Sequence, residues 1–193
     1  IGFWRDYLEG KGITVQSVEQ RFGMEVLPFD DPDGMRIELV ASDAPGAVQH
    51  WEMGPIPQVH ALSGFHSVTL WLEEIEPTAD LLINQMGYTL AGEEGNRHRF
   101  IGGPDSLAHT LDILHRPVQP EDMPDEAVFG AGSIHHIAFR VPTDEEQLEY
   151  QSTLRGAGYG VTPVRDRSYF HSIYYREPGG VLFEIATETP GFT

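Results

Sequence analysis

Cysteine is absent from the 193 residues, which excludes disulfide bonds and thiolate metal sites. A metal site built from this chain must therefore use His, Asp or Glu side chains. No stretch approaches the run of about 18 apolar residues that a membrane-spanning helix needs, and no signal-like segment opens the sequence. We expect no membrane partner, and the cytoplasm is the default location.

Basic residues are scarce as well. The chain has 12 Lys and Arg against 30 Asp and Glu, a net charge of −18, and its only lysine is Lys11. Such a charge repels nucleic acid and anionic membranes, so we expect neither as a partner. Two interpretations of the acidity stay open: an ordinary acidic protein, or a halophilic protein whose self-repulsion is screened by a high-salt cytoplasm.

The sequence contains an internal repeat. A shift of 146 residues, without gaps, aligns residues 8–38 with 154–184. The identical pairs are Leu8/Leu154, Gly10/Gly156, Gly12/Gly158, Val15/Val161, Val18/Val164, Arg21/Arg167, Pro32/Pro178, Gly34/Gly180 and Glu38/Glu184. A third copy lies between them, because residues 65–70 resemble 134–139 and residues 111–113 resemble 183–185. Each full copy shows the pattern of a strand, a helix and three further strands.

The repeat predicts an α+β fold of tandem βαβββ modules. The predicted organisation is a truncated module at 1–41, a connector at 42–61, a module at 62–115, a connector at 116–131 and a last module at 132–193. In the truncated module we expect a helix over 1–12 and strands over 15–21, 24–29 and 35–41. Residue 1 aligns with Gln147, inside the predicted helix of the last module, so the opening strand of the first module is missing. We therefore expect the chain to be the C-terminal portion of a longer protein.

An unusual carboxylate marks the last module. Glu184 lies within an apolar run, where a buried charge is costly unless it is paired or binds a cation. Strand alternation places the side chain of Glu184 on the other face of its strand from Phe183 and Ile185. It likewise places His136 on the open face of the sheet and His135 on the face that packs under the helix. His136 and Glu184 can then meet, and an imidazole with a carboxylate suits Fe(II), Mn(II), Ni(II) or Zn(II). A metal-free His–Glu hydrogen bond explains the same pattern, and a third protein ligand is not evident.

Polar side chains precede this carboxylate along the chain. Tyr174 lies ten residues before Glu184, so a hairpin can bring the two together. Arg167 has the chemistry to hold an anionic or phenolic oxygen. His171 is a weaker candidate for the same site.

The other two copies keep an acidic residue at the position of Glu184 but change its surroundings. Glu38 and Asp112 occupy that position, and Ser67 replaces His136 in the middle copy. A degenerate second site from Glu38, Ser67 and Asp112 is conceivable. We expect structural or solvated roles for these three residues instead.

Residues 132–139, 166–180 and 182–187 resemble the glyoxalase/vicinal-oxygen-chelate superfamily, and within it the hydroquinone-type extradiol ring-cleaving dioxygenases. The resemblance implies four βαβββ modules with curled mixed sheets and an Fe(II) held by two His and one Glu. His136 and Glu184 match two of these ligands, and the third is a His of a module that is absent from this chain. The resemblance further implies that Tyr174 orients the substrate, Arg167 handles its oxygen charge and His135 transfers protons.

The expected function is that of a non-haem Fe(II) dioxygenase that opens a hydroquinone or catechol-like ring with O2. The expected partners are a small aromatic substrate and O2, and a homo-oligomer stays open. We expect the isolated chain to be inactive because the third metal ligand is missing. Two alternatives remain: a glyoxalase-like metal-dependent isomerase, and a non-catalytic module of the same fold that binds a small molecule.

Overall fold

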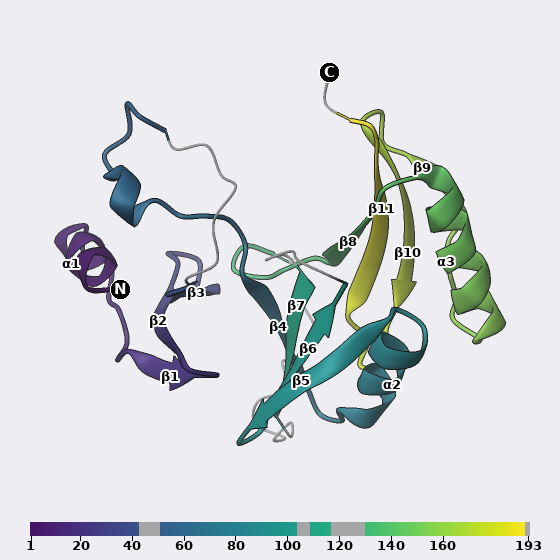
Figure 1. Cartoon of the computed structure of the whole chain (residues 1–193), viewed down its shortest axis with the longest axis horizontal. Coiled ribbons are helices and arrows are strands. Elements are labelled where there is room, and N and C mark those ends of the chain that lie inside the picture. Colours follow the sequence, from purple (N-terminus) through teal and green to yellow (C-terminus); the bar gives the residue numbers. More distant parts are fainter. Residues whose placement is uncertain (43–50, 104–108, 117–129, 192–193) are drawn as a thin grey trace. The chain divides into compact units, whose positions relative to one another are not determined.

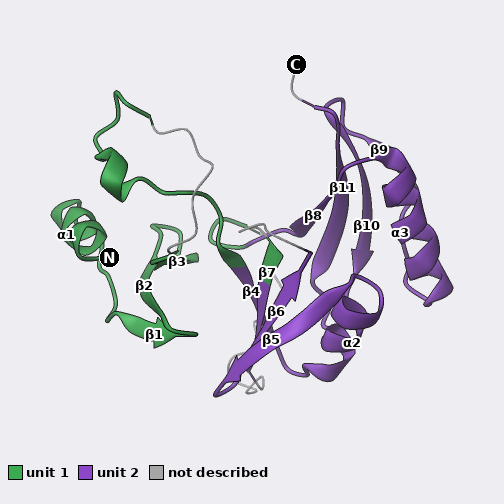
Figure 2. Ribbon diagram, in the orientation of Figure 1, with its two compact units in different colours: residues 1–67, 104–110, 128–133 green, residues 68–103, 111–127, 134–193 purple. Residues whose placement is uncertain are grey.

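The computed structural model describes residues 1–42, 51–103, 109–116 and 130–191 (Figure 1). The chain divides into two compact units (Figure 2): residues 1–67, 104–110 and 128–133 form one, and residues 68–103, 111–127 and 134–193 form the other. Most of the predicted connector at 116–131, and residues 43–50 of the connector at 42–61, lie outside the described residues. The module boundaries therefore stay predictions.

The described residues of the first unit form an α-helix, a short 3-10 helix, η1 (Gln58–His60), and a small sheet. Helix α1 (Gly2–Gly10) precedes strands β1 (Glu19–Arg21), β2 (Met24–Asp30) and β3 (Arg36–Val40), which lie in the order β1-β2-β3. Leu8, Leu27 and Phe29 form its buried core. The strand predicted over 15–21 is shorter than expected: only β1 pairs continuously, and Val15 forms an isolated bridge to Phe29.

The second unit contains two four-stranded sheets of the same topology. The first sheet has the order β4-β7-β6-β5 and the second has the order β8-β11-β10-β9. The elements of the first copy are β4 (Ser67–Leu72), α2 (Glu76–Asn84), β5 (Tyr88–Glu94), β6 (Arg97–Gly102) and β7 (Thr110–His115). Those of the second copy are β8 (Ile137–Val141), α3 (Asp144–Gly156), β9 (Arg165–Asp166), β10 (Phe170–Arg176) and β11 (Leu182–Pro190). The predicted α+β fold of βαβββ modules is confirmed.

Alternation along the strands builds the core of this unit. Phe183 and Ile185 are fully buried and pack with Leu81 of α2, Leu154 of α3 and Ile173 of β10 in one apolar cluster. Burial of such aliphatic and aromatic side chains stabilises the fold by about 1.5–3 kcal/mol each. Because alternate residues fill this core, Glu184 and its strand neighbours of like parity face the other side of the sheet. No helix in the described part of the chain is long and apolar enough to cross a membrane.

The register of β11 fixes what lies beside Glu184. Strand β11 pairs antiparallel with β10, where Tyr174 is opposite Glu184, and parallel with β8, where Ala138 is opposite Glu184. The turn between β10 and β11 ends at Gly180, whose φ of +92° is a left-handed conformation that favours glycine. Strand β8 begins later than predicted, because its ladder with β11 starts at Ile137. In the middle copy, the strand that covers most of the repeat segment 65–70 is β4, over Ser67–Leu72.

Candidate metal centre

Two potential metal ligands of the last module lie side by side. The Nε2 atom of His136 is 2.7 Å from Oε2 of Glu184, as the sequence pattern predicts. Glu184 is almost completely buried, at 3% exposure, whereas His136 is partly open to solvent. The direct His–Glu contact and a shared cation involve the same two atoms, so both interpretations of the sequence pattern lead to this pair.

A hydroxyl holds the other oxygen of Glu184. Tyr174 donates a hydrogen bond of 2.7 Å to Oε1 of Glu184. Its phenolic oxygen accepts hydrogen bonds from Nη2 of Arg167 at 3.1 Å and from Oγ of Ser172 at 3.2 Å. With one proton donated and two accepted, the hydrogen-bonding capacity of this phenol is full. The Tyr174 hydroxyl therefore has one fixed orientation, in which its O–H group points toward Glu184.

His135 lies beside the pair in a different position from the one predicted. Its Nδ1 is 2.9 Å from Nδ1 of His136, and its side chain is exposed instead of core-facing. The reason is that β8 begins at Ile137, so strand alternation does not extend back to His135. A continuous series of close polar contacts thus runs from Arg167 through Tyr174, Glu184 and His136 to His135.

Two further residues of β10 clarify the site. His171, the weaker candidate, directs its ring to Asp144 of helix α3, with Nδ1 and Oδ1 2.6 Å apart. Ser172 was missed in the sequence, although it is fully buried and contacts the Tyr174 hydroxyl. Its signal was its spacing of two from Tyr174, which places both side chains on one face of a strand.

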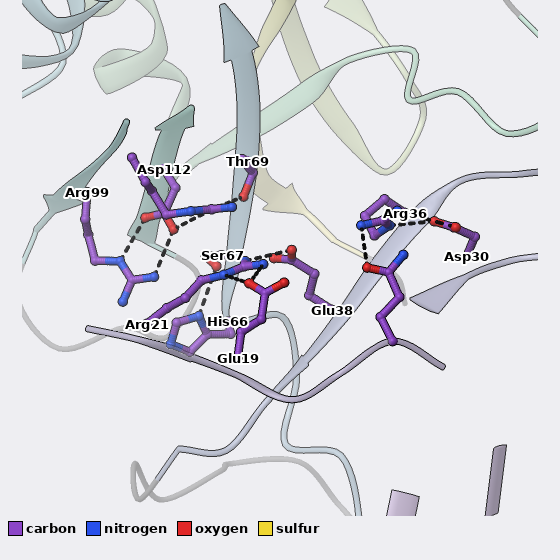
Figure 3. Close-up of polar contacts among 12 residues, drawn as sticks. Glu19, Arg21, Asp30, Arg36, Glu38, His66, Ser67, Thr69, Arg99 and Asp112 are labelled. Atoms are coloured by element: carbon purple, nitrogen blue, oxygen red, sulfur yellow. Dashed lines mark hydrogen bonds and ion pairs between the residues drawn. The ribbon is translucent and has the colours of Figure 1, made fainter. Parts of the chain in front are cut away.

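The acidic residues of the other copies are bound by arginines (Figure 3). In the first unit, Arg21 contacts Glu38 at 2.7 Å. In the second unit, Asp112 is 1% exposed, and its Oδ1 accepts a hydrogen bond from Nε of Arg99 at 2.8 Å. Its Oδ2 lies 3.1 Å from Nη1 of Arg97.

Ser67 has a local partner, because its Oγ is 3.0 Å from Nδ1 of His66 (Figure 3). The ion pairs with arginine agree with the structural role expected for Glu38 and Asp112, and the role of Ser67 stays a prediction. Within the described residues, no group of three or more His, Asp or Glu side chains is arranged to hold a metal. In this part of the chain, the His136–Glu184 pair therefore offers two potential metal ligands without a third.

Comparison with known proteins places this geometry in a family. The glyoxalase/bleomycin resistance protein/dioxygenase superfamily matches residues 64–185. The chain is 41% identical, over its whole length, to MhqO of Bacillus subtilis (strain 168), which is provisionally named a ring-cleaving dioxygenase. It is 34% identical, again over its whole length, to a chlorohydroquinone/hydroquinone 1,2-dioxygenase of Sphingobium indicum. The chain spans 59% and 60% of the lengths of these two relatives.

Solved structures agree with this placement. The crystal structure of a provisionally named dioxygenase from Bacillus subtilis superposes on 99% of this chain and 59% of its own, with a TM-score of 0.88 and 40% identity. A fosfomycin resistance protein, FosX of Listeria monocytogenes, solved with Mn(II), covers 67% of this chain and 94% of its own at a TM-score of 0.51. Its 23% identity indicates a shared fold only. The family match and the repeated βαβββ topology together establish that the chain belongs to the glyoxalase/bleomycin resistance protein/dioxygenase superfamily.

Proposed function

We propose that this chain is part of a non-haem Fe(II) dioxygenase that opens the ring of a hydroquinone or catechol-like substrate with O2. The observation that carries the proposal is the His136–Glu184 pair, whose ligand atoms are 2.7 Å apart and whose carboxylate is held by Tyr174. The names of two relatives, a ring-cleaving and a hydroquinone dioxygenase, support the same reaction class. The whole chain aligns with both, so the aligned part includes the proposed ligands.

The donor set fits a divalent cation. Ligand atoms at about 2.1 Å from one ion and at right angles to each other are about 3 Å apart, close to the separation of the two atoms here. His136 Nε2 and Glu184 Oε2 would hold the ion, while Tyr174 occupies the other carboxylate oxygen. A neutral imidazole with a carboxylate also accepts Mn(II), Ni(II) or Zn(II) as substitutes.

The surrounding side chains supply orientation and proton transfer. When bound, Fe(II) supplies the redox chemistry that lets O2 react with an aromatic ring. Tyr174 restricts Glu184 to one ligand oxygen and, held in one orientation by its three hydrogen bonds, orients the substrate with its ring. Arg167, bonded to that phenol, provides positive charge for a phenolate oxygen of the substrate. His135, exposed beside His136, accepts the proton that the substrate hydroxyl loses.

The partners of the proposed enzyme follow from the same chemistry: it uses a small aromatic substrate and O2. The cytoplasm stays the default location, and the net charge of −18 leaves the halophilic and the ordinary acidic interpretation both open. Two ligands bind Fe(II) weakly, so we expect the isolated chain to be inactive and activity to require the full-length protein. A homo-oligomer is compatible with the proposal, and analytical ultracentrifugation measures the oligomeric state.

The test is anaerobic Fe(II) loading of the full-length protein, followed by oxygen uptake with substituted hydroquinones and catechols. His136→Ala and Glu184→Gln should lose bound iron and oxygen uptake. Glu188→Gln is the matched control, because Glu188 lies on the same strand but forms an exposed ion pair with Arg140. Absence of uptake with every substrate, or iron retention in both site variants, would refute the proposal.

A further inference from the structure

The three copies of the module place a carboxylate at the same position but surround it differently. Asp112 is bound by two arginines of the neighbouring strand, Arg97 and Arg99, and Glu38 is bound by Arg21. In the described part of the chain, no ion pair joins Glu184 to an arginine. Among the described residues, therefore, only the last copy pairs this carboxylate with a histidine and a phenol instead of an arginine, and a neutral imidazole leaves its negative charge for another cation.

The register of the first and last copies shows which residue differs. In the β2–β3 hairpin, Pro28 lies directly opposite Glu38, and in the β10–β11 hairpin, Tyr174 lies directly opposite Glu184. The shift of 146 residues that relates the copies also aligns Pro28 with Tyr174. The small proline ring has no group that can reach across the pair to the carboxylate, whereas the tyrosine hydroxyl bonds it at 2.7 Å.

An arginine is retained in both copies, and its partner changes with that residue. Arg21 aligns with Arg167. Arg21 bonds Glu38 directly at 2.7 Å, but Arg167 bonds the hydroxyl of Tyr174, which in turn bonds Glu184. The two bonds in series set an upper limit of about 6 Å on the distance between the Arg167 guanidinium and the Glu184 carboxylate, and within the described residues no hydrogen bond or ion pair joins the two directly.

We propose that Tyr174 is a positioning residue that holds Arg167 away from Glu184 and so keeps this carboxylate available to a divalent cation. The inference rests on the proposed metal site. Without the phenol, the Arg167 guanidinium takes the place that Arg21 has on Glu38, and it competes with the metal for the same oxygens. A bidentate-capable guanidinium is a strong competitor, because charge-assisted hydrogen bonds to carboxylates are about twice as strong as neutral ones.

A double-mutant cycle tests this role. Zn(II) affinity is measured by calorimetry for the full-length protein, Tyr174→Ala, Arg167→Gln and the double variant. We expect Tyr174→Ala to weaken Zn(II) binding about 10–100-fold, the usual range for groups that support a ligand. The double variant should regain most of that loss, because the competing guanidinium is gone. Tyr169→Ala, an exposed tyrosine between β9 and β10, is the control and should keep wild-type affinity.

Other outcomes are equally informative. Tyr174→Ala could weaken Zn(II) binding equally in the wild-type protein and in Arg167→Gln. That result would mean that the phenol acts only as a hydrogen-bond donor to Glu184, and it would overturn the inference. A crystal structure of metal-free Tyr174→Ala gives a second measurement that does not depend on metal binding: Arg167 should contact Glu184 as Arg21 contacts Glu38. A wild-type protein that binds no metal refutes the proposed function, while this structure still decides the role of Tyr174. Urea unfolding of each variant confirms that it is folded.

Discussion

Replacing Glu177 by glutamine is expected to lower the free energy of unfolding by about 2–3 kcal/mol. Glu177 is 2% exposed and begins the turn that leads into β11. Its Oε2 accepts hydrogen bonds from the amide of Gly179 at 2.8 Å and from the hydroxyl of Thr78 at 2.5 Å, and its Oε1 accepts from the amide of Val181 at 2.7 Å. Thr78 is fully buried in helix α2, so this carboxylate joins the helix of one module to the turn of the next.

The same turn occurs in the first unit with a different use of the carboxylate. Asp31, the repeat counterpart of Glu177, accepts hydrogen bonds from the amides of Asp33 and Met35, at 2.9 and 2.8 Å, on a single oxygen, Oδ1. An asparagine keeps that oxygen, so Asp31→Asn should cost less than about 0.5 kcal/mol at this more exposed position. Asp31→Asn is therefore the matched control for Glu177→Gln.

The magnitude follows from which donors lose an acceptor. Glu177 uses both of its oxygens, so a glutamine in its place sets an amide NH2 against a buried donor on one side. An unsatisfied buried donor costs about 1–3 kcal/mol, and the remaining hydrogen bonds lose their charge assistance. Thr78→Val, which keeps the shape and removes one hydroxyl, should cost about 1–2 kcal/mol.

Urea unfolding at constant pH, followed by circular dichroism, measures these differences. The expected order of destabilisation is Glu177→Gln, then Thr78→Val, then Asp31→Asn. If Glu177→Gln and Asp31→Asn destabilised the protein equally, the two-oxygen account of Glu177 would be wrong. If Thr78→Val were neutral, the hydroxyl would contribute nothing to the contact between α2 and the turn.

Two other predictions concern pH and salt. The hydrogen bond to Asp144 raises the pKa of His171, burial opposes this, and the charges of Asp144 and Asp166 reinforce it. Since the folded pKa lies above the unfolded value, this stabilisation is fully present below about pH 6.5 and is lost as pH rises through the folded pKa. Urea unfolding of His171→Gln should show a small loss of stability in acid that disappears at alkaline pH, and a loss independent of pH would contradict this. For the halophilic interpretation, the melting temperature should rise as KCl increases from about 0.1 M to about 2 M, because the net charge of −18 is screened. A melting temperature that does not rise with KCl would exclude it.

Two features of the candidate site could be predicted, because the orientation of Glu184 and its pairing with Tyr174 depend on short-range rules. The spacing of ten residues across a hairpin places Tyr174 opposite Glu184, and alternation places Glu184 away from the core. His136 lies one residue before the parallel ladder of β8 with β11, and this pairing of distant segments brings it close to Glu184. His135 was misplaced by the same rule, because alternation applies only where the ladder exists, and the ladder starts at Ile137.

The contacts that the sequence did not reveal depend on the reach of side chains. The pattern of Glu38, Asp112 and Glu184 showed a recurring acidic position, but nothing in its spacing told an arginine-bound carboxylate from one held by a phenol. The deciding residues lie on the neighbouring strand: Pro28 in one copy and Tyr174 in the other.

Glu177 was missed for another reason. Its counterpart in the repeat is Asp31, so a comparison restricted to identical residues passes over the pair. Both carboxylates nevertheless bond the amides two and four residues later, and each turn ends in a glycine with positive φ, Gly34 or Gly180. Backbone amides that point into the turn need a hydrogen-bond acceptor, and either an Asp or a Glu carboxylate can provide it. Aligning repeats by hydrogen-bonding capacity as well as identity would have predicted a structural carboxylate at Glu177, separate from the proposed ligand at Glu184.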